Sequence, residues 1–179
     1  EIGKLANNFN QMIEQVKDRD FIQETFGRYV PESVASAILE NKGEFKAQHR
    51  LATILYTDIQ SFTTICESLS PDGVVNLLNE YFSILVEIIN KRGGVVNQFQ
   101  GDAMLVTFNV PVANANHAAD AVQTAIDIQH ALADHIFCHG EKMVTRIGVN
   151  TGNVVAGSVG ANERLNYTVH GDAVNVAAR

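Results

Sequence analysis

The feature that most constrains the fold is a nearly continuous apolar run at residues 51–59, which contains an aspartate, Asp58, just before its end. Such a run is typical of a central strand buried inside a sheet. A chain of 179 residues, 46% of them hydrophobic, is long enough and apolar enough to bury this strand in one packed core. We therefore expect one domain of ordinary size around this strand.

The segments that follow alternate between helical and strand-like patterns. Amphipathic or short helices are predicted at residues 61–69, 71–92 and 115–135, and a helix opens at 173–179. Strands are predicted at 95–99 and 104–108, joined as a hairpin, and at 145–149 and 153–157, joined as a further hairpin around Thr151 and Gly152. Residues 167–169 fit a strand or a loop. The order is βαββαβ, which predicts an α+β, ferredoxin-like and palm-like antiparallel sheet with helices.

This topology brings two aspartates together. Its first and third strands lie side by side at the centre and run in opposite directions, so the end of the first strand meets the turn between the second and third. Asp58 lies at that end and Asp102 lies in that turn. Two adjacent carboxylates repel unless a cation neutralises them, so the pair predicts a site for divalent metal ions. Taken singly, each aspartate also fits an ordinary surface position.

Other candidate residues surround this pair. The turn after Asp58 leads into a helix at Phe62 and Thr63, whose free N–H groups could hold phosphate. Arg146 opens a mostly apolar strand and is a candidate phosphate ligand, or else an edge arginine that reaches solvent. Asn175 and Arg179, one helical turn apart, are expected on one helix face, where they could hold ribose and phosphate.

The charge is distributed unevenly along the chain. The net charge is −7, and residues 51–179 carry six Lys or Arg against twelve Asp or Glu. This balance argues against binding to nucleic acid or anionic lipid, and a polyanionic ligand here would need metal ions. No apolar run reaches the roughly 18 residues of a membrane span, and the two cysteines are too few for a disulfide framework. These observations suggest a soluble intracellular domain.

The first 50 residues differ in pattern from the rest. Apolar residues at helical spacing form a seam along residues 1–20: Ile2, Leu5, Phe9, Met12 and Val16. We expect this helix to pair with a second copy in a coiled-coil-like contact, the alternative being packing on its own domain. A second helical stretch follows Pro31 and stops at residues 41–43.

Four blocks in order resemble the signature motifs of class III nucleotidyl cyclases. They are Tyr-Thr-Asp-Ile-Gln-Ser-Phe-Thr at 56–63, Gln-Gly-Asp at 100–102, Arg-Ile-Gly-Val-Asn-Thr-Gly at 146–152 and the block at 167–179. The likeness covers residues 51–179. Residues 1–12 are similar to the end of a HAMP signalling domain, and residues 26–34 to the transducing segment before such catalytic domains. The implied division is a HAMP-like helix at 1–20, a transducing linker at 21–50 and a catalytic domain at 51–179.

The resemblance implies a reaction and a set of site residues. Members of this family make 3′,5′-cyclic nucleotides and pyrophosphate at the interface of a head-to-tail dimer. By analogy Asp58 and Asp102, helped by the Ile59 carbonyl, would hold two Mg²⁺ or Mn²⁺ ions. Arg146 of the same subunit would contact the triphosphate. The other subunit would supply Asn175 for the ribose and Arg179 for the α-phosphate.

The base-reading positions depart from the family pattern. Gln98 stands where adenylyl cyclases usually carry lysine and guanylyl cyclases glutamate, and its partner position is Thr168. An amide holds both a donor and an acceptor and accommodates either purine by turning over. Thr168, accepting from the adenine amine, favours ATP.

The sequence thus predicts an adenylate cyclase that works as a homodimer regulated through its N-terminal helix. The alternatives are a guanylate cyclase and a nucleotide-binding regulatory domain without turnover. By resemblance, the family normally continues beyond Arg179, so we expect the catalytic domain to be C-terminally incomplete. We also expect a cytoplasmic domain whose parent carries an upstream sensor or membrane domain and lies at the inner face of the cell membrane.

Overall fold

The structure is a computed structural model that describes residues 13, 16–17, 47–138, 140, 142–161 and 164–179. Within the predicted coiled-coil segment only Ile13, Val16 and Lys17 are described, and they are helical and exposed. The rest of that seam, residues 21–46 of the linker predicted at 21–50 and the helix after Pro31 lie outside the described residues. The HAMP-like and transducing segments therefore stay predictions.

Five antiparallel strands form one sheet in the order β2-β3-β1-β4-β5. The strands are β1 Gln48–Ile59, β2 Val95–Gln100, β3 Ala103–Phe108, β4 Thr145–Ala161 and β5 Arg164–His170. The predicted α+β class is confirmed, with the first and third strands antiparallel neighbours at the centre. β1 begins at Gln48, earlier than predicted, because its ladder with β4 extends to Ala156.

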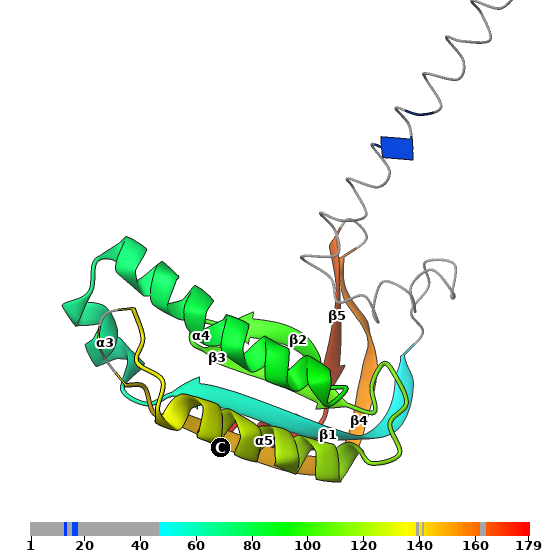
Figure 1. The fold of residues 1–179 in the computed structure, drawn as a ribbon. Helices are drawn as coiled ribbons and strands as arrows, with labels where there is room; N and C mark the ends of the chain where they lie inside the picture. Colours follow the sequence, from blue (N-terminus) through cyan, green and yellow to red (C-terminus); the bar gives the residue numbers. More distant parts are fainter. Residues whose placement is uncertain (1–12, 14–15, 18–46, 139, 141, 162–163) are drawn as a thin grey trace, which may run out of the picture.

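Helices lie unequally on the two sides of this sheet. α4 (Pro71–Lys91) and α5 (His117–Ala133) cover one side (Figure 1), with α3 (Phe62–Ser68) at their edge. We call this the helix face; its side chains include Leu55, Met104 and Val106. The opposite side, which carries α6 (Asp172–Ala177), we call the site face. None of the described helices is both long and apolar enough to cross a membrane.

The core of the helix face comes largely from α4. Its buried Leu77, Tyr81, Leu85 and Ile89 recur at every fourth position, so they form one stripe along the helix. This stripe packs on the alternate residues of β1 and β3 that point the same way. Ser70 caps the start of α4 by accepting a hydrogen bond from the Gly73 amide at 3.2 Å. The packed helix face holds the central strands in fixed register.

The hairpin predicted at residues 145–157 is wrong. β4 is one continuous strand that pairs with β1 without interruption from Thr145 to Ala156. The pair Thr151-Gly152 suggested a turn, but Gly152 has a packing role instead. A Cβ on Gly152 would lie 2.9 Å from the Ala173 Cβ of α6. Glycine is needed there for close approach of a helix, and the chain continues straight through it.

Candidate active site

The two predicted aspartates are neighbours in the structure. Asp58 is the penultimate residue of β1, and Asp102 lies in the turn between β2 and β3. The backbone N–H of Ile59 donates a hydrogen bond to Asp102 Oδ2 at 3.1 Å. Both side chains are only partly buried. The sheet topology therefore brings together two carboxylates that are 44 positions apart in the sequence, as predicted.

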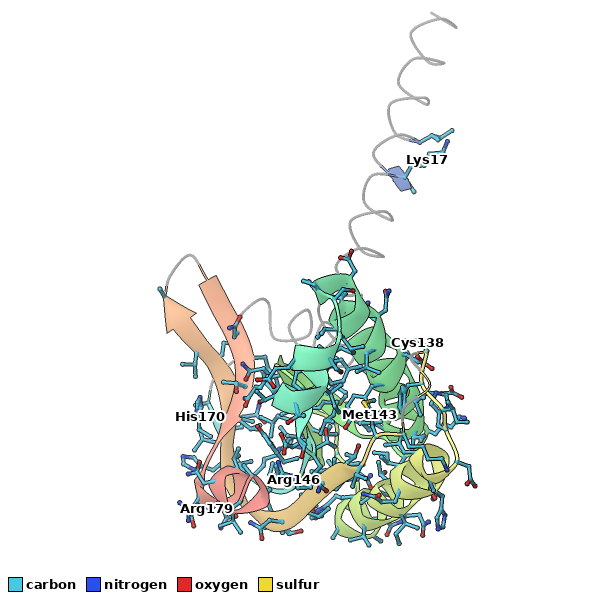
Figure 2. All side chains as sticks on the ribbon, turned by 90° about the vertical axis from the view of Figure 1, so that its left-hand side faces the viewer. Lys17, Cys138, Met143, Arg146, His170 and Arg179 are labelled. Atoms are coloured by element: carbon cyan, nitrogen blue, oxygen red, sulfur yellow. The ribbon has the colours of Figure 1, made fainter. Side chains whose placement is uncertain are left out.

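Arg146 completes the cluster from β4. The register pairs Arg146 directly with Asp58, and its guanidinium donates to Asp58 Oδ2. Figure 2 shows Arg146 near the start of β4. Its side chain is 66% exposed, so it remains accessible to a ligand. The sequence left two alternatives for Arg146, a phosphate ligand or an edge arginine that reaches solvent. In the structure its side chain pairs with Asp58 at the candidate site and is also largely exposed, which fits either alternative.

The donor set fits a hard divalent cation. Two carboxylates and the Ile59 carbonyl are oxygen ligands of the kind that Mg²⁺ and Mn²⁺ prefer. Each aspartate uses Oδ2 in the contacts above, and among the described residues neither Oδ1 has a hydrogen-bond partner. The described residues hold no cluster of three or more His, Cys, Asp or Glu suited to a metal. Further ligands would therefore come from water and substrate phosphate, as is usual for Mg²⁺.

The loop that follows Asp58 turns sharply into α3. Ser61 adopts a left-handed conformation with φ of 58°, unusual for a residue other than glycine. Its carbonyl accepts hydrogen bonds from the amides of Thr64 and Ile65. The first N–H groups of the helix, those of Phe62 and Thr63, have no acceptor within the helix. The predicted phosphate-facing amides thus lie at the start of α3, four and five residues after Asp58.

Gln98 lies on β2 at the exposed edge of the site face. The register places it opposite Leu105, whose side chain belongs to the apolar cluster of the site face. Its carbonyl accepts a hydrogen bond from the Gln100 amide at 3.2 Å, and the Gln100 carbonyl accepts one from the Tyr56 hydroxyl at 3.2 Å. Burial, together with the nearby Asp58 and Asp102 carboxylates, raises the pKa of Tyr56. The Tyr56 hydroxyl therefore stays protonated and donates this hydrogen bond.

Thr168 lies on β5, at the other edge of the sheet. It pairs with Gly157 of β4, between Tyr167 and Val169. Those two side chains pack on the apolar cluster of the site face, so strand alternation turns Thr168 to the other side of β5. Within the described residues Thr168 and Gln98 share no hydrogen bond. β2 and β5, the strands that carry this predicted base-reading pair, nevertheless approach each other within one chain.

Two glycines of β4 allow α6 to lie on the sheet. A Cβ on Gly148 would lie 1.9 Å from the Ala177 carbonyl oxygen, and one on Gly152 would lie 2.9 Å from the Ala173 Cβ. The Asn150 amide donates to the Ala173 carbonyl at 3.2 Å. Because Ala173 and Ala177 face the sheet, Asn175 faces solvent.

α6 spans Asp172–Ala177, and the Ala178 amide still bonds to the Val174 carbonyl at 3.1 Å, as in an α-helix. The Arg179 amide bonds to the Val176 carbonyl at 3.3 Å, in a tighter turn. Arg179 is exposed and lies at the end of α6 in Figure 2.

The comparisons with known proteins identify the architecture. The family model of the adenylate and guanylate cyclase catalytic domain matches residues 45–179. The chain belongs to this family. The match begins a few residues before β1.

Individual relatives agree with this assignment. The uncharacterized protein Rv1320c of Mycobacterium tuberculosis is 38% identical over all of this chain and 31% of its own length. The chain thus spans about a third of that relative. The crystal structure of the guanylyl cyclase Cya2 superposes with a TM-score of 0.70 at 34% identity, over 74% of this chain and 69% of that one. A bacterial light-regulated adenylyl cyclase superposes with a TM-score of 0.77 at 30% identity, over 96% of this chain and 51% of that one.

Sequence reasoning missed some residues of this cyclase domain. Tyr56 and Gln100 lie inside the recognised motifs, yet no role was predicted for either. The signal for Tyr56 was strand alternation, because it lies two residues before Asp58 and so on the same face. Tyr81 was also missed; its buried hydroxyl accepts a hydrogen bond from Thr145 at 3.2 Å, and burial raises its pKa. Tyr81 thus ties α4 to the start of β4, next to Arg146.

Proposed function

We propose that this cyclase domain converts ATP into 3′,5′-cyclic AMP and pyrophosphate at a site shared by two copies of the chain. The observation that carries the proposal is the cluster of Asp58, Asp102 and Arg146 on neighbouring strands, joined through the Ile59 amide. In our proposal the domain works in the cytoplasm, in a parent protein at the inner face of the cell membrane. The N-terminal helix would transmit the signal of an upstream sensor.

Asp58, Asp102 and the Ile59 carbonyl would hold two Mg²⁺ or Mn²⁺ ions. Bound there, the ions would activate the ribose 3′-hydroxyl for attack and neutralise the departing pyrophosphate. Arg146 already neutralises Asp58 in the structure. With cations in that role, its guanidinium would be free to contact the triphosphate, together with the amides of Phe62 and Thr63.

The second copy would supply the groups that orient the nucleotide. Asn175 would bind the ribose, and Arg179 would stabilise charge on the α-phosphate in the transition state. Both side chains are exposed at the outer side of α6 and beyond its end, which supports a role toward another molecule. A homodimer arranged in this way has two equivalent sites.

ATP is the proposed substrate because Gln98 and Thr168 together suit adenine. Adenine offers an acceptor at N1 and a donor at N6, while guanine presents a donor at N1. GTP is the second candidate, since the similar structures include a guanylyl cyclase at 34% identity as well as an adenylyl cyclase at 30%.

The test is product formation by the full-length protein with Mn²⁺, from ATP and from GTP in separate reactions. Cyclic AMP as the main product supports the proposal. Cyclic GMP as the main product keeps the reaction but refutes the substrate. If a folded dimer binds nucleotide and yields neither product, a regulatory domain without turnover is the better description.

A further inference from the structure

Three polar side chains form a continuous hydrogen-bonded chain across the site face. The Tyr56 hydroxyl on β1 donates to the Gln100 carbonyl oxygen at 3.2 Å. The Gln100 amide nitrogen donates to the Gln98 carbonyl oxygen at 3.2 Å. Tyr56 is partly buried, whereas the two glutamines on β2 are exposed. The chain therefore runs from a fixed residue in the sheet to an accessible amide at its edge.

The direction of this chain determines which end of the Gln98 amide is available. A glutamine amide has one carbonyl acceptor and two N–H donors. Gln100 already donates to the Gln98 carbonyl, so the amide nitrogen of Gln98 is the group left for a ligand. Turning Gln98 over alone would place its nitrogen against the Gln100 nitrogen, so two donors would face each other. Gln98 can therefore turn only if Gln100 turns with it and the Tyr56 hydroxyl gives up its role as donor.

We propose that Tyr56 and Gln100 are positioning residues that hold Gln98 with its amide nitrogen outward, and thereby favour ATP over GTP. The inference rests on the proposed role of Gln98 as the base reader. An outward N–H donor complements the adenine N1 acceptor, whereas it meets another donor at guanine N1–H. Tyr56 and Gln100 touch no substrate themselves; they act through Gln98.

The test measures kcat/KM for ATP and for GTP in the full-length protein and in the variants Tyr56→Phe and Gln100→Leu. Each variant breaks one hydrogen bond of the chain, so the ATP-to-GTP ratio should fall about fivefold in each. The ATP-to-GTP ratio of the double variant should fall no further than that of either single variant, because both substitutions break the same hydrogen-bonded chain. A purely structural role of Tyr56 would lower both activities and leave the ratio unchanged.

Repeating the Tyr56→Phe substitution in a Gln98→Lys protein separates the positioning role from any effect on folding. Lysine has donors only and needs no orientation, so Gln98→Lys should prefer ATP whether or not Tyr56 keeps its hydroxyl. Adding Tyr56→Phe to Gln98→Lys should therefore leave the ratio unchanged. Ser68→Ala is the matched control, since it also removes a hydroxyl that makes a hydrogen bond, to the Ile65 carbonyl on α3 at 2.8 Å. Its ratio should equal that of the wild type.

Two outcomes would overturn the inference: a Tyr56→Phe ratio equal to that of the wild type, or the same loss of ratio in the Gln98→Lys background. The wild-type products test the proposed function separately. A wild type that prefers GTP, with a ratio that still falls in Tyr56→Phe, refutes ATP as substrate and supports the positioning role. A wild type that prefers ATP, with no change in Tyr56→Phe, refutes the positioning role alone.

Discussion

The two faces of the sheet are built from the same strands but differ in composition. On the helix face, α4 and α5 cover alternate residues of the central strands, among them Leu55, Met104 and Val106, all fully buried. On the site face, the alternate positions of β1 and β4 include Asp58 and Arg146, both partly or largely exposed. The helices α4 and α5 cover the helix face, whereas α6 and a smaller apolar cluster cover only part of the site face and leave the end with Asp58 and Arg146 accessible. The difference suggests that stability comes chiefly from the helix face and chemistry from the site face.

The largest expected effect comes from removing either acidic residue of the site face. Asp58→Ala or Asp102→Ala should lower turnover about 1,000-fold or more, because loss of a metal ligand removes several kcal/mol of transition-state stabilisation. The unfolding temperature should change little, since relief of the repulsion between the two carboxylates offsets the loss of the Arg146 pair or of the Ile59 hydrogen bond. Product assays and thermal unfolding of the same samples test both statements. A large loss of stability would contradict the separation of roles between the faces.

Mixing variants tests whether the site is shared between two copies. Asp58→Ala chains mixed equally with Arg179→Ala chains should recover about a quarter of wild-type activity, because half the dimers are mixed and each has one intact site. Neither variant alone should show this activity. Mixed dimers, detected by two affinity tags, that remain inactive would contradict the shared site.

Close packing of α6 on β4 gives the next effect. Gly148→Ala should cost about 3 kcal/mol of unfolding free energy, because the new methyl group overlaps the Ala177 carbonyl. Turnover should fall as well, since α6 carries Asn175. Gly152→Ala should cost less, about 1 kcal/mol, because its nearest neighbour is the Ala173 methyl group at 2.9 Å. Urea unfolding measures both, and equal costs would show that α6 is not held as described.

Removing the Arg146 side chain should lower turnover by a smaller factor and, at the same time, tighten the binding of Mn²⁺. Arg146→Ala should lower turnover about 30-fold, the loss of a charge-assisted contact of about 2 kcal/mol. Binding of Mn²⁺ without nucleotide should become tighter, because Asp58 loses its competing partner. Calorimetric titration with Mn²⁺ measures this change. Arg92→Ala is the matched control: it breaks an Arg–Asp pair between α4 and α5, so both quantities should stay at wild-type values.

The smallest effect belongs to the helix face. His135 and the Cys138 amide hydrogen-bond to Glu80 and lower the pKa of its carboxyl group. A lowered pKa in the folded state stabilises the protein above the ordinary glutamate pKa, and the contribution is lost as the pH falls through the folded value. Glu80→Gln should therefore cost about 1 kcal/mol at pH 7. The cost should shrink toward zero in acid.

Urea unfolding at pH 7 and at successively lower pH measures this dependence. Glu87→Gln is the control on the same helix, because its exposed pair with Lys91 should contribute little at any pH. A cost for Glu80→Gln that does not change with pH would mean that packing, and not the charge, is responsible.

Much of this architecture could be predicted from periodicity. The apolar run at 51–59 predicts the central strand, and the order of elements predicts that Asp58 and Asp102 meet. Both inferences need only the pleat of a strand and the topology of the sheet. The same rules miss β4, where Gly152 suggested a turn although the glycine serves close packing against α6. Local sequence cannot distinguish these two uses of glycine.

The finer contacts of the site could not be predicted, because they depend on side-chain positions across strands. The pairing of Arg146 with Asp58 follows from the register of β1 and β4, which the sequence does not specify residue by residue. The chain from Tyr56 to Gln98 likewise needs the β1 and β2 side chains on one face. The position of Thr168 depends on where β5 joins the sheet.

The alternation of β1 has a consequence for how the protein folds. Leu55 and Thr57 are fully buried and point to the helix face, while Tyr56 and Asp58 alternate with them, are only partly buried and point to the site face. A slip of the strand by one residue would exchange these sets and bury the Asp58 carboxylate among aliphatic side chains. An unpaired buried charge is strongly unfavourable, so misaligned forms of the sheet are unstable and reopen. The acidic residue at the site therefore also selects the correct alignment of the central strand during folding.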